Sequence, residues 1–451
     1  MKSSIVLLIL VSILYLTKVC QSDDDEGLAA TAPTNAEDTT TAKPTSEAIT
    51  AEDTTSETTA KPPVTTAEAA TEATTLDPTK KLSFKDKYKK FKNKAKIYIH
   101  DTTKKLKDIL HFDLTKLDIR NLTQFIPFYE EYKNIFNKKY ANEQEKEERS
   151  SLFKRTIERI RQHNANMKSK YIKGLNELSD MSFAEILKLK LGFKQDGGDV
   201  MVKASAPVPS VADLPKEWDW RKYGILTTPR NQDKCGSCWS FAAAAVLESH
   251  NMKRQIAEGK FDPMKPLTVS EQNLIDCSAD FGTNGCEGGM PQQGFKYVAA
   301  NQGINSITEY PYTGIKTKCT YNPKKKVDVE VKEGKRLKSG QDNDLVTAIY
   351  NYGPVTIALH LTKDMASYKS GIFDDPKCNP KKVNHAVVAV GYTPDYFILR
   401  NSWGPKWGDE GYIKVARSKL NNCGISQQCY YPVLTNAVET QHMRDKLQEK
   451  P

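Results

Sequence analysis

The distribution of cysteines constrains this 451-residue chain more than any other feature of its sequence. Nine cysteines are present, and all of them except Cys20 lie C-terminal to residue 234. Disulfides form in oxidising compartments, so this clustering predicts one compact, disulfide-stabilised region there and none elsewhere. Position alone does not decide which cysteines pair. The eight are Cys235, Cys238, Cys277, Cys286, Cys319, Cys378, Cys423 and Cys429.

The first residues indicate how the chain reaches such a compartment. Lys2 precedes an apolar run from Ile5 to Leu16, and small residues near Ser22 offer a cleavable junction. The run is too short for a membrane-spanning helix, which needs about 20 apolar residues. We therefore expect residues 1–22 to be a secretory signal peptide rather than a membrane anchor. No later stretch predicts a transmembrane segment, so the mature protein is expected in the secretory pathway, extracellular or lysosomal.

Residues 23–79 have a composition that disfavours a packed core. They are mainly Thr, Ala, Glu, Ser and Pro, lack aromatic residues, and repeat Ala-Glu-Asp-Thr-Thr at Ala36 and Ala51. Such a segment cannot bury enough apolar surface to offset its ordering entropy, so we expect a disordered, mucin-like arm. An O-glycosylated stalk and an unmodified spacer both fit this composition.

Residues 80–120 are rich in lysine and carry much of the formal net charge of +10. Phe84, Tyr88 and Phe91 follow helical spacing, which predicts either an amphipathic helix packed on the next domain or a helix on a membrane surface. No nucleic-acid motif accompanies the charge, so we expect no nucleic-acid partner. A solvated charged surface explains this charge best, and contact with an anionic surface, such as a glycan or lipid head groups, is the alternative.

Helical periodicity continues through residues 121–192. An aromatic stripe runs from Phe125 to Phe136, and a second apolar face follows in steps of three and four up to Asn164. Asn121 opens a glycosylation sequon. Residues 193–213 contain Gly-Gly and Ala-Pro-Val-Pro-Ser, which is typical of a linker exposed to proteolysis.

Residues 214–433 predict an α+β domain. A helix is expected over Ser240–Lys253, and the second half contains strand-like segments. Residues 434–451 form a C-terminal tail for which the sequence suggests no role. The predicted strands are Val355–Leu361, Ala386–Tyr392, Tyr396–Arg400 and Gly411–Ala416.

One string in this domain carries a specific chemical signal, Gln232-Asp-Lys-Cys-Gly-Ser-Cys-Trp-Ser-Phe241. It contains Cys-Gly-Ser-Cys-Trp, a papain-type signature that is followed by a His and an Asn roughly 130–150 residues downstream. His385 and Asn401 occupy those places. Taken singly, Cys238 is compatible with half of a disulfide or with a redox pair formed with Cys235. His385 alone is compatible with a buried core histidine, and Asn401 alone with a turn residue. Together and in this order they predict catalysis.

The chemistry explains why these residue types are needed. The thiolate of Cys238 is the nucleophile, and a helix N-terminus and the His385 imidazole both favour it over the thiol. Asn401 accepts from the far N–H of the ring and fixes its tautomer. Gln232 and the Cys238 backbone N–H donate to the oxyanion. Trp403 shields the His–Asn contact from water.

Residues 214–433 thereby resemble papain and the cathepsin L-like cysteine proteases over their full length. The resemblance implies a two-lobed fold, with a helical lobe and a β-barrel-like lobe on either side of a cleft. It also implies protein and peptide substrates, inhibition by cystatin-like proteins, a monomeric mature enzyme, and neither cofactor nor metal. The matching strings are Leu214–Arg221, Leu267–Cys277, Gly285–Gly289, Tyr310–Tyr312, Asn384–Ala386 and Asn401–Trp407.

The same resemblance assigns further site residues. Gly288 and Gly289 would pair with an extended substrate, and Trp407 would contact the leaving group. Gln428 would lie at the far end of the main pocket, where it either narrows the pocket or admits polar side chains. The pocket would otherwise be lined by Met290, Pro291, Ala358, Val383 and Ala386, with Asn384 alongside. The implied disulfides are Cys235–Cys286, Cys277–Cys319 and Cys378–Cys423, which leaves Cys429 as a buried thiol or a partner for another chain.

The segment Glu145–Asn164 resembles the helix of the inhibitory propeptide in this family, and Gly174–Asp180 resembles its second string, with Thr156 and Leu178 as departures. The residues that follow would then run through the cleft in reverse direction and block it. Carboxylates such as Asp180 would sense acid or simply support helix packing. We therefore expect a zymogen of a cysteine endopeptidase that is activated by proteolysis at acidic pH.

Two rival functions remain compatible with the sequence. One is a secreted binding protein that keeps the fold without catalysis. The other keeps the protease but makes the Thr-rich arm the functional centre, as an adhesive or tethering stalk.

Overall fold

The helix that begins at Cys238 lies between a group of helices and a large sheet. The computed structural model describes residues 109–193, 214–263 and 265–448. The expected signal peptide, the mucin-like arm, most of the Lys-rich segment and nearly all of the activation linker lie outside the described residues. No described helix is long and apolar enough to cross a membrane.

Residues 109–193 form a helical part with an apolar core of their own. Tyr132 and Phe153 are fully buried there, with ring centroids 4.3 Å apart. Asn142 starts the longest helix by accepting a hydrogen bond from the Glu145 N–H at 2.9 Å, which is a typical N-cap. Ile109 is also part of this core, although it precedes the boundary expected at residue 121. The elements are η1 (Leu114–Lys116), α3 (Leu122–Ile135), α4 (Glu143–Asn164), β1 (Tyr171–Lys173) and α5 (Phe183–Lys190).

Helices dominate the first half of the following domain. The predicted helix over Ser240–Lys253 is confirmed as α6 (Cys238–Ala257), and its alanine-rich surface is buried on nearly every side. Small side chains allow α7, α8 and the sheet to approach it closely. The other helices are η3 (Trp220–Tyr223), α7 (Glu271–Cys277), η4 (Ala279–Phe281), η5 (Gly285–Glu287), α8 (Pro291–Ala300), η6 (Pro323–Lys325), α9 (Asp342–Asn351), α10 (Lys363–Ala366) and η7 (Asn422–Gly424).

The second half of the domain is built on a sheet with the order β1-β7-β10-β9-β8-β6-β11-β5, and β2 pairs with β8. The four predicted strands are confirmed as β6, β8, β9 and β10, and the α+β prediction is confirmed with them. A separate pair, β3 (Ile304–Asn305) and β4 (Lys326–Val327), lies in the helical half. The strands of the large sheet are β2 (Trp218–Asp219), β5 (Val331–Arg336), β6 (Val355–Leu359), β7 (Tyr368–Phe373), β8 (His385–Tyr392), β9 (Tyr396–Arg400), β10 (Tyr412–Ala416) and β11 (Cys429–Leu434).

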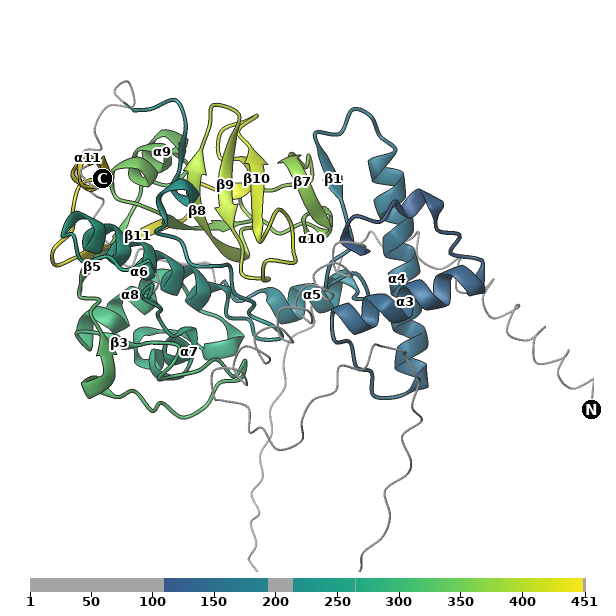
Figure 1. Cartoon of the computed structure of the whole chain (residues 1–451), viewed down its shortest axis with the longest axis horizontal. Coiled ribbons are helices and arrows are strands. Elements are labelled where there is room, and N and C mark those ends of the chain that lie inside the picture. The colour runs from purple at the N-terminus through teal and green to yellow at the C-terminus, as the bar shows by residue number, and fades with distance from the viewer. Residues whose placement is uncertain (1–108, 194–213, 264, 449–451) are drawn as a thin grey trace, which may run out of the picture. The chain divides into compact units, whose positions relative to one another are not determined.

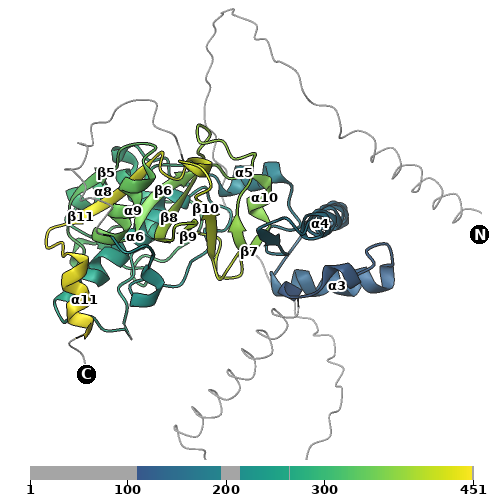
Figure 2. The ribbon, with the colours of Figure 1, turned by 90° about the horizontal axis from the view of Figure 1, so that it is seen from above.

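The N-terminal helical part attaches to the edge of this sheet. β1 pairs antiparallel with β7, with Tyr171 opposite Gly371, so it contributes the outermost strand (Figures 1 and 2). Gly371 has a φ of +91°, and a Cβ there would lie 2.5 Å from the Lys170 carbonyl oxygen. This edge therefore requires glycine, because a side chain would separate the two strands.

Three disulfides stabilise the domain, and their pairs are those that the family resemblance implied. They are Cys235–Cys286, Cys277–Cys319 and Cys378–Cys423. Cys238 and Cys429 are free and buried. Cys238 is therefore neither half of a disulfide nor paired with Cys235, and Cys429 is a buried thiol rather than a surface partner for another chain.

The C-terminal tail contains a helix, α11 (Thr440–Gln448), that packs against α6. Met443 is fully buried, and the Arg444 guanidinium lies 5.5 Å from the centre of the Trp218 ring. The tail thus covers apolar surface near the start of the domain. Sequence analysis proposed no structure for it.

Candidate active site

Cys238 is the first residue of α6, directly after a loop that the Cys235–Cys286 disulfide holds in place. Ser237 precedes the helix and makes no side-chain capping bond. The backbone N–H groups of Cys238 and Trp239, at the start of the helix, act on the thiol and oppose the rise in its pKa. The Ala386 N–H donates to Cys238 Sγ at 3.4 Å. Since Ala386 follows His385, this contact brings the thiol to the start of β8.

His385 and Asn401 meet because β8 and β9 are antiparallel neighbours, so the start of one lies near the end of the other. His385 Nε2 donates to Asn401 Oδ1 at 2.8 Å, and that oxygen also accepts from the Ser402 N–H at 2.9 Å. The Trp403 ring centroid lies 5.1 Å from the imidazole and covers it. His385 Nδ1 is buried and makes no hydrogen bond within the described residues. It is therefore the ring atom left to take a proton from the thiol.

Gln232 is fully buried beside these groups. Its Nε2 donates to the Cys235 carbonyl at 2.8 Å, and also to the Lys190 carbonyl at 3.2 Å. Its Oε1 accepts from Ser402 Oγ at 2.6 Å, which fixes the orientation of the amide. Sequence analysis placed Ser402 in a family string but missed this positioning role, since the contact joins residues far apart in the chain.

The residues after α5 cross the site in extended form. The Lys190 carbonyl occupies the place in front of the Gln232 amide, and the Gly192 carbonyl accepts from the Gly289 N–H at 2.8 Å. Phe193 continues in a parallel bridge with Gly289 and is buried. A Cβ on Gly192 would lie 1.6 Å from the Gly236 carbonyl oxygen, so only glycine fits. The chain thus blocks its own candidate nucleophile.

Burial under this segment changes the pKa values of both Cys238 and His385. Desolvation raises the pKa of the Cys238 thiol to about 11, against the opposing effect of the N–H groups of Ala386 and Gly192. Desolvation lowers the pKa of His385 to about 4, although its bond to Asn401 acts in the other direction. Both groups are therefore neutral near pH 7 in this state, and the thiol is inactive as a nucleophile.

Comparison with known proteins agrees with this geometry. The model of the papain family of cysteine proteases matches residues 214–433, and that of the cathepsin propeptide inhibitor domain (I29) matches residues 129–186. A cathepsin L-like protein of Caenorhabditis elegans is 33% identical over 326 residues, which cover 70% of this chain and 94% of that protein. The chain belongs to the papain family of cysteine proteases. It is a zymogen that carries its own inhibitory propeptide.

Other relatives of this papain-family chain lead to the same conclusion. Pro-cathepsin H of Mus musculus is 38% identical over 292 residues, covering 63% of this chain and 84% of that protein. The structure is similar to that of the digestive procathepsin L 3 of Tenebrio molitor, with a TM-score of 0.60, 33% identity, and coverage of 69% of this chain and 99% of that one. The prediction of a papain-like fold with a propeptide domain is confirmed.

The predicted substrate-binding residues lie on two sides of this papain-family site. Gly288, Gly289 and Met290 form the loop that enters α8, with Gly288 at a φ of +119°, and Pro291 is the first residue of that helix. On the sheet side, Ala358 on β6 lies opposite Ala386 on β8, and its N–H donates to the Gln428 carbonyl at 3.0 Å. The Gln428 side chain accepts from the Tyr430 hydroxyl at 3.2 Å and is buried, so part of its polarity is already satisfied.

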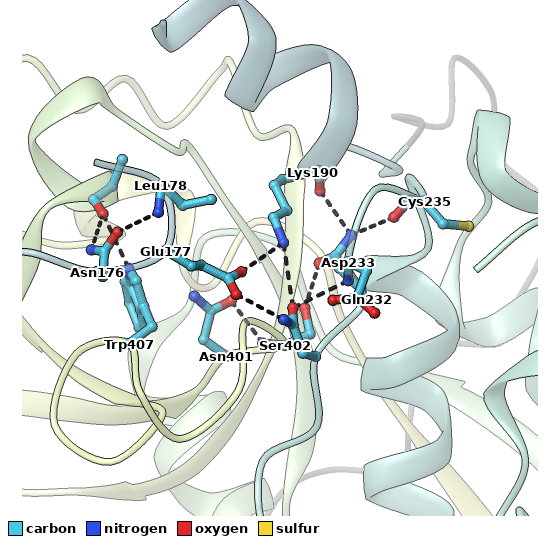
Figure 3. A network of polar contacts seen from close by, with 12 residues as sticks. Asn176, Glu177, Leu178, Lys190, Gln232, Asp233, Cys235, Asn401, Ser402 and Trp407 are labelled. Carbon is cyan, nitrogen blue, oxygen red and sulfur yellow. Dashed lines mark hydrogen bonds and ion pairs between the residues drawn. The ribbon is translucent and has the colours of Figure 1, made fainter. Parts of the chain in front are cut away.

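Three other predicted residues have structural contacts of their own. The Asn384 side chain accepts from the Leu361 N–H at 2.9 Å and so supports the turn before β8. Val383 is buried in that turn. Trp407 donates from Nε1 to the Ala366 carbonyl at 3.2 Å, and propeptide Asn176 donates to the same oxygen at 2.8 Å (Figure 3).

A polar network that sequence analysis did not predict joins the propeptide to the loop that precedes Cys238 (Figure 3). Lys190 Nζ lies 3.0 Å from Glu177 Oε1 and donates to Asn231 Oδ1 at 3.3 Å, and Asn231 Nδ2 donates to Glu177 Oε2 at 2.9 Å. The Lys190 side chain is only 5% exposed. Its charge is therefore balanced mainly by the Glu177 carboxylate, which belongs to the propeptide, while the neutral Asn231 amide accepts a hydrogen bond from it.

Asp180, the candidate acid sensor, is buried within the propeptide. It accepts from the hydroxyls of Tyr132 and Tyr140 at 3.0 and 2.7 Å, and from Lys138 Nζ at 2.7 Å. Arg149, by contrast, pairs with Glu185 at 2.7 Å. Acid sensing by Asp180 stays a prediction.

Two further expectations concern groups outside the cleft. Asn121 is exposed, and its Oδ1 caps α3 by accepting from the Thr123 N–H at 3.0 Å. Its glycosylation stays a prediction. Within the described ranges, His, Cys, Asp and Glu side chains form no group of three or more that could hold a metal ion.

Proposed function

We propose that the protein is an endopeptidase that hydrolyses peptide bonds through a thioester at Cys238, after proteolysis has removed residues up to the linker that ends at residue 213. One observation carries the proposal. The free thiol at the start of α6 accepts from the Ala386 N–H, and the adjacent His385 donates from Nε2 to Asn401. His385 Nδ1 has no hydrogen-bond partner among the described residues.

The first step is proton transfer from the thiol to His385 Nδ1, once water replaces the propeptide and the cost of charge falls. The thiolate attacks the scissile carbonyl carbon, and the C=O electron pair moves to the oxygen. Gln232 Nε2 donates to that oxygen, as it now does to the Lys190 carbonyl. The C–N bond breaks as the imidazolium gives its proton to the leaving amine.

Hydrolysis of the thioester completes the cycle. His385 removes a proton from water, the hydroxyl adds to the acyl carbon, and the Cys238 thiolate leaves. Asn401 holds the ring in one orientation in both halves, since its oxygen is fixed by the Ser402 N–H.

The apolar residues of the pocket favour substrates with a bulky hydrophobic side chain two residues before the scissile bond. Met290, Ala358 and Ala386 are all buried and apolar. The Gln428 backbone carbonyl accepts from the Ala358 N–H, and the side-chain Oε1 of Gln428 accepts from the Tyr430 hydroxyl. This arrangement favours the interpretation that Gln428 narrows the pocket. Passage through the secretory pathway fits the disulfides. Activation in an acidic extracellular or lysosomal space fits the neutral state of Cys238 and His385 in the zymogen.

The test is a Cys238→Ala chain, in which nothing outside the cleft changes. We expect it to be secreted and folded with the propeptide bound, and we expect it not to process itself. After processing by an added protease, it should not hydrolyse a peptide with Phe or Leu two residues before the cleavage point. A Cys429→Ala chain is the matched control, because Cys429 is also a free buried thiol but lies outside the site. Hydrolysis by the Cys238→Ala protein at the wild-type rate would exclude this mechanism.

A further inference from the structure

The structure shows a lysine side chain bound beside the oxyanion position, and the groups that hold it belong partly to the mature enzyme. Lys190 places its carbonyl on Gln232 and its ammonium group on Asn231 (Figure 3). Within residues 190–193, the chain passes from this loop to Gly289 on the acyl side of the cleft. Lys190 therefore lies on the opposite side, where the leaving group of a substrate would be.

The mature enzyme fixes its part of this lysine site without help from the propeptide. The backbone at Asn231 bridges to Trp403, and the neighbouring Gln232 N–H donates to the Ser402 carbonyl at 2.9 Å. Asn231 Oδ1 also accepts from the Asp233 N–H at 3.1 Å, which holds the amide oxygen in place. Removing residues 109–193 breaks none of these contacts.

Asp233 supplies a carboxylate on the same turn. It has a φ of +47° and is exposed, with its side chain free of any ion pair within 4 Å in the described part of the chain. Lys190 lowers the pKa of Asp233, although partial desolvation has the larger effect and raises it. The adjacent Lys234 interacts electrostatically with propeptide Glu145.

In the zymogen, Glu177 is the main counter-ion of Lys190, but it leaves with the propeptide. An ammonium or guanidinium group that enters the vacated place then has Asn231 Oδ1 as an acceptor and Asp233 as the carboxylate on the same turn. A glutamate side chain would meet the same two groups with repulsion from Asp233.

We propose that Asn231 and Asp233 form a subsite for a basic residue on the leaving-group side of the cleft, so that the mature enzyme prefers Lys or Arg within the first two residues after the scissile bond. This inference rests on the proposed peptidase function and adds a substrate class to it.

The experiment uses the processed enzyme and quenched fluorescent peptides that share one acyl side and differ only after the scissile bond. Lys, Arg, Leu or Glu is placed at the first or the second position. For an ion pair at a partly exposed site, we expect kcat/KM for Lys to exceed that for Leu by about threefold to tenfold at one of these positions, with Glu slowest.

Asp233→Asn is the informative variant, since Asn tolerates a positive φ and only the charge is lost. We expect it to reduce the Lys-to-Leu ratio by about threefold. Asp395→Asn is the control, because Asp395 is an exposed carboxylate at the β8–β9 turn, at the opposite end of β8 from His385, and its substitution should leave the ratio unchanged. The wild-type ratio should also fall as salt is raised, a readout that needs no variant.

A Lys-to-Leu ratio near one at both positions would overturn the inference, as would an Asp233→Asn ratio equal to that of the wild type. Failure of the peptidase proposal looks different, since no peptide of the series would then be hydrolysed in a Cys238-dependent way.

Discussion

The ionisation of Cys238 in the zymogen provides a quantitative test of how the propeptide keeps the enzyme inactive. Desolvation raises the pKa of this thiol from 9.0 to about 11. Two pKa units correspond to about 2.7 kcal/mol of preference for the neutral thiol in the buried state. At pH 7 the thiolate would then be roughly one part in ten thousand. Removing the propeptide restores water and leaves the helix N-terminus and His385, which both favour the thiolate.

Absorbance at 240 nm reports the thiolate directly at equilibrium. The measured quantity is the absorbance of the zymogen minus that of a Cys238→Ser zymogen, from pH 6 to 10.5. The absorbance of the tyrosines and of the buried Cys429 cancels in this difference, because both proteins contain them. We expect no midpoint below pH 9.5 in the zymogen, and a midpoint well below 8.5 in the processed enzyme. A zymogen midpoint at or below 8.5 would show that the propeptide does not act by desolvating the thiol, and the reasoning would fail.

Three substitutions test other parts of the structure. Glu177→Gln removes the counter-ion of the buried Lys190, which we expect to weaken propeptide binding by about 1–3 kcal/mol and to speed processing at neutral pH, as followed by gel electrophoresis. Gly192→Ala places a Cβ 1.6 Å from the Gly236 carbonyl oxygen, so the zymogen should show activity before cleavage, measured with a small peptide substrate. Gln232→Ala in the processed enzyme should lower kcat by about 10²–10³ with little change in KM, because the amide acts mainly on the oxyanion.

The Glu177→Gln prediction has a matched control, and each of the three predictions has an outcome that would contradict it. Glu147→Gln removes an exposed propeptide carboxylate and should leave the processing rate unchanged. An equal effect of Glu147→Gln and Glu177→Gln would contradict the role given to the Lys190 pair. A fully latent Gly192→Ala zymogen would contradict the close backbone approach. A Gln232→Ala enzyme with wild-type kcat would remove the amide from the mechanism.

Patterns that are local in the sequence predicted most of the fold. Helical spacing of aromatic residues predicted α3, and short apolar runs predicted β8 and β9, because each pattern reflects one buried face or strand. The three candidate catalytic side chains were predicted from short strings, since each string fixes one local backbone geometry and the family resemblance orders them. The pairing of β1 with β7 was not predicted, because the register of an edge strand depends on a partner about 200 residues away.

The groups that sequence analysis missed all act across long distances in the chain. Ser402 orients Gln232, and Lys190 crosses to Asn231 and Gln232, yet no spacing rule links these positions. The tail helix α11 was missed because its periodicity is short and weakly apolar, and only Met443 is deeply buried. Tertiary packing, rather than intrinsic propensity, stabilises such an element.

The most direct test of the central claim is to trap the acyl group on the processed enzyme. A peptide ester with a hydrophobic residue two positions before the reacting carbonyl is mixed with enzyme, quenched in acid within milliseconds, digested and measured by mass spectrometry. We predict one acyl group per active site, attached to Cys238, and its absence in a His385→Ala enzyme. An acyl group found on another residue, or turnover of the ester without any modification of Cys238, would contradict the account.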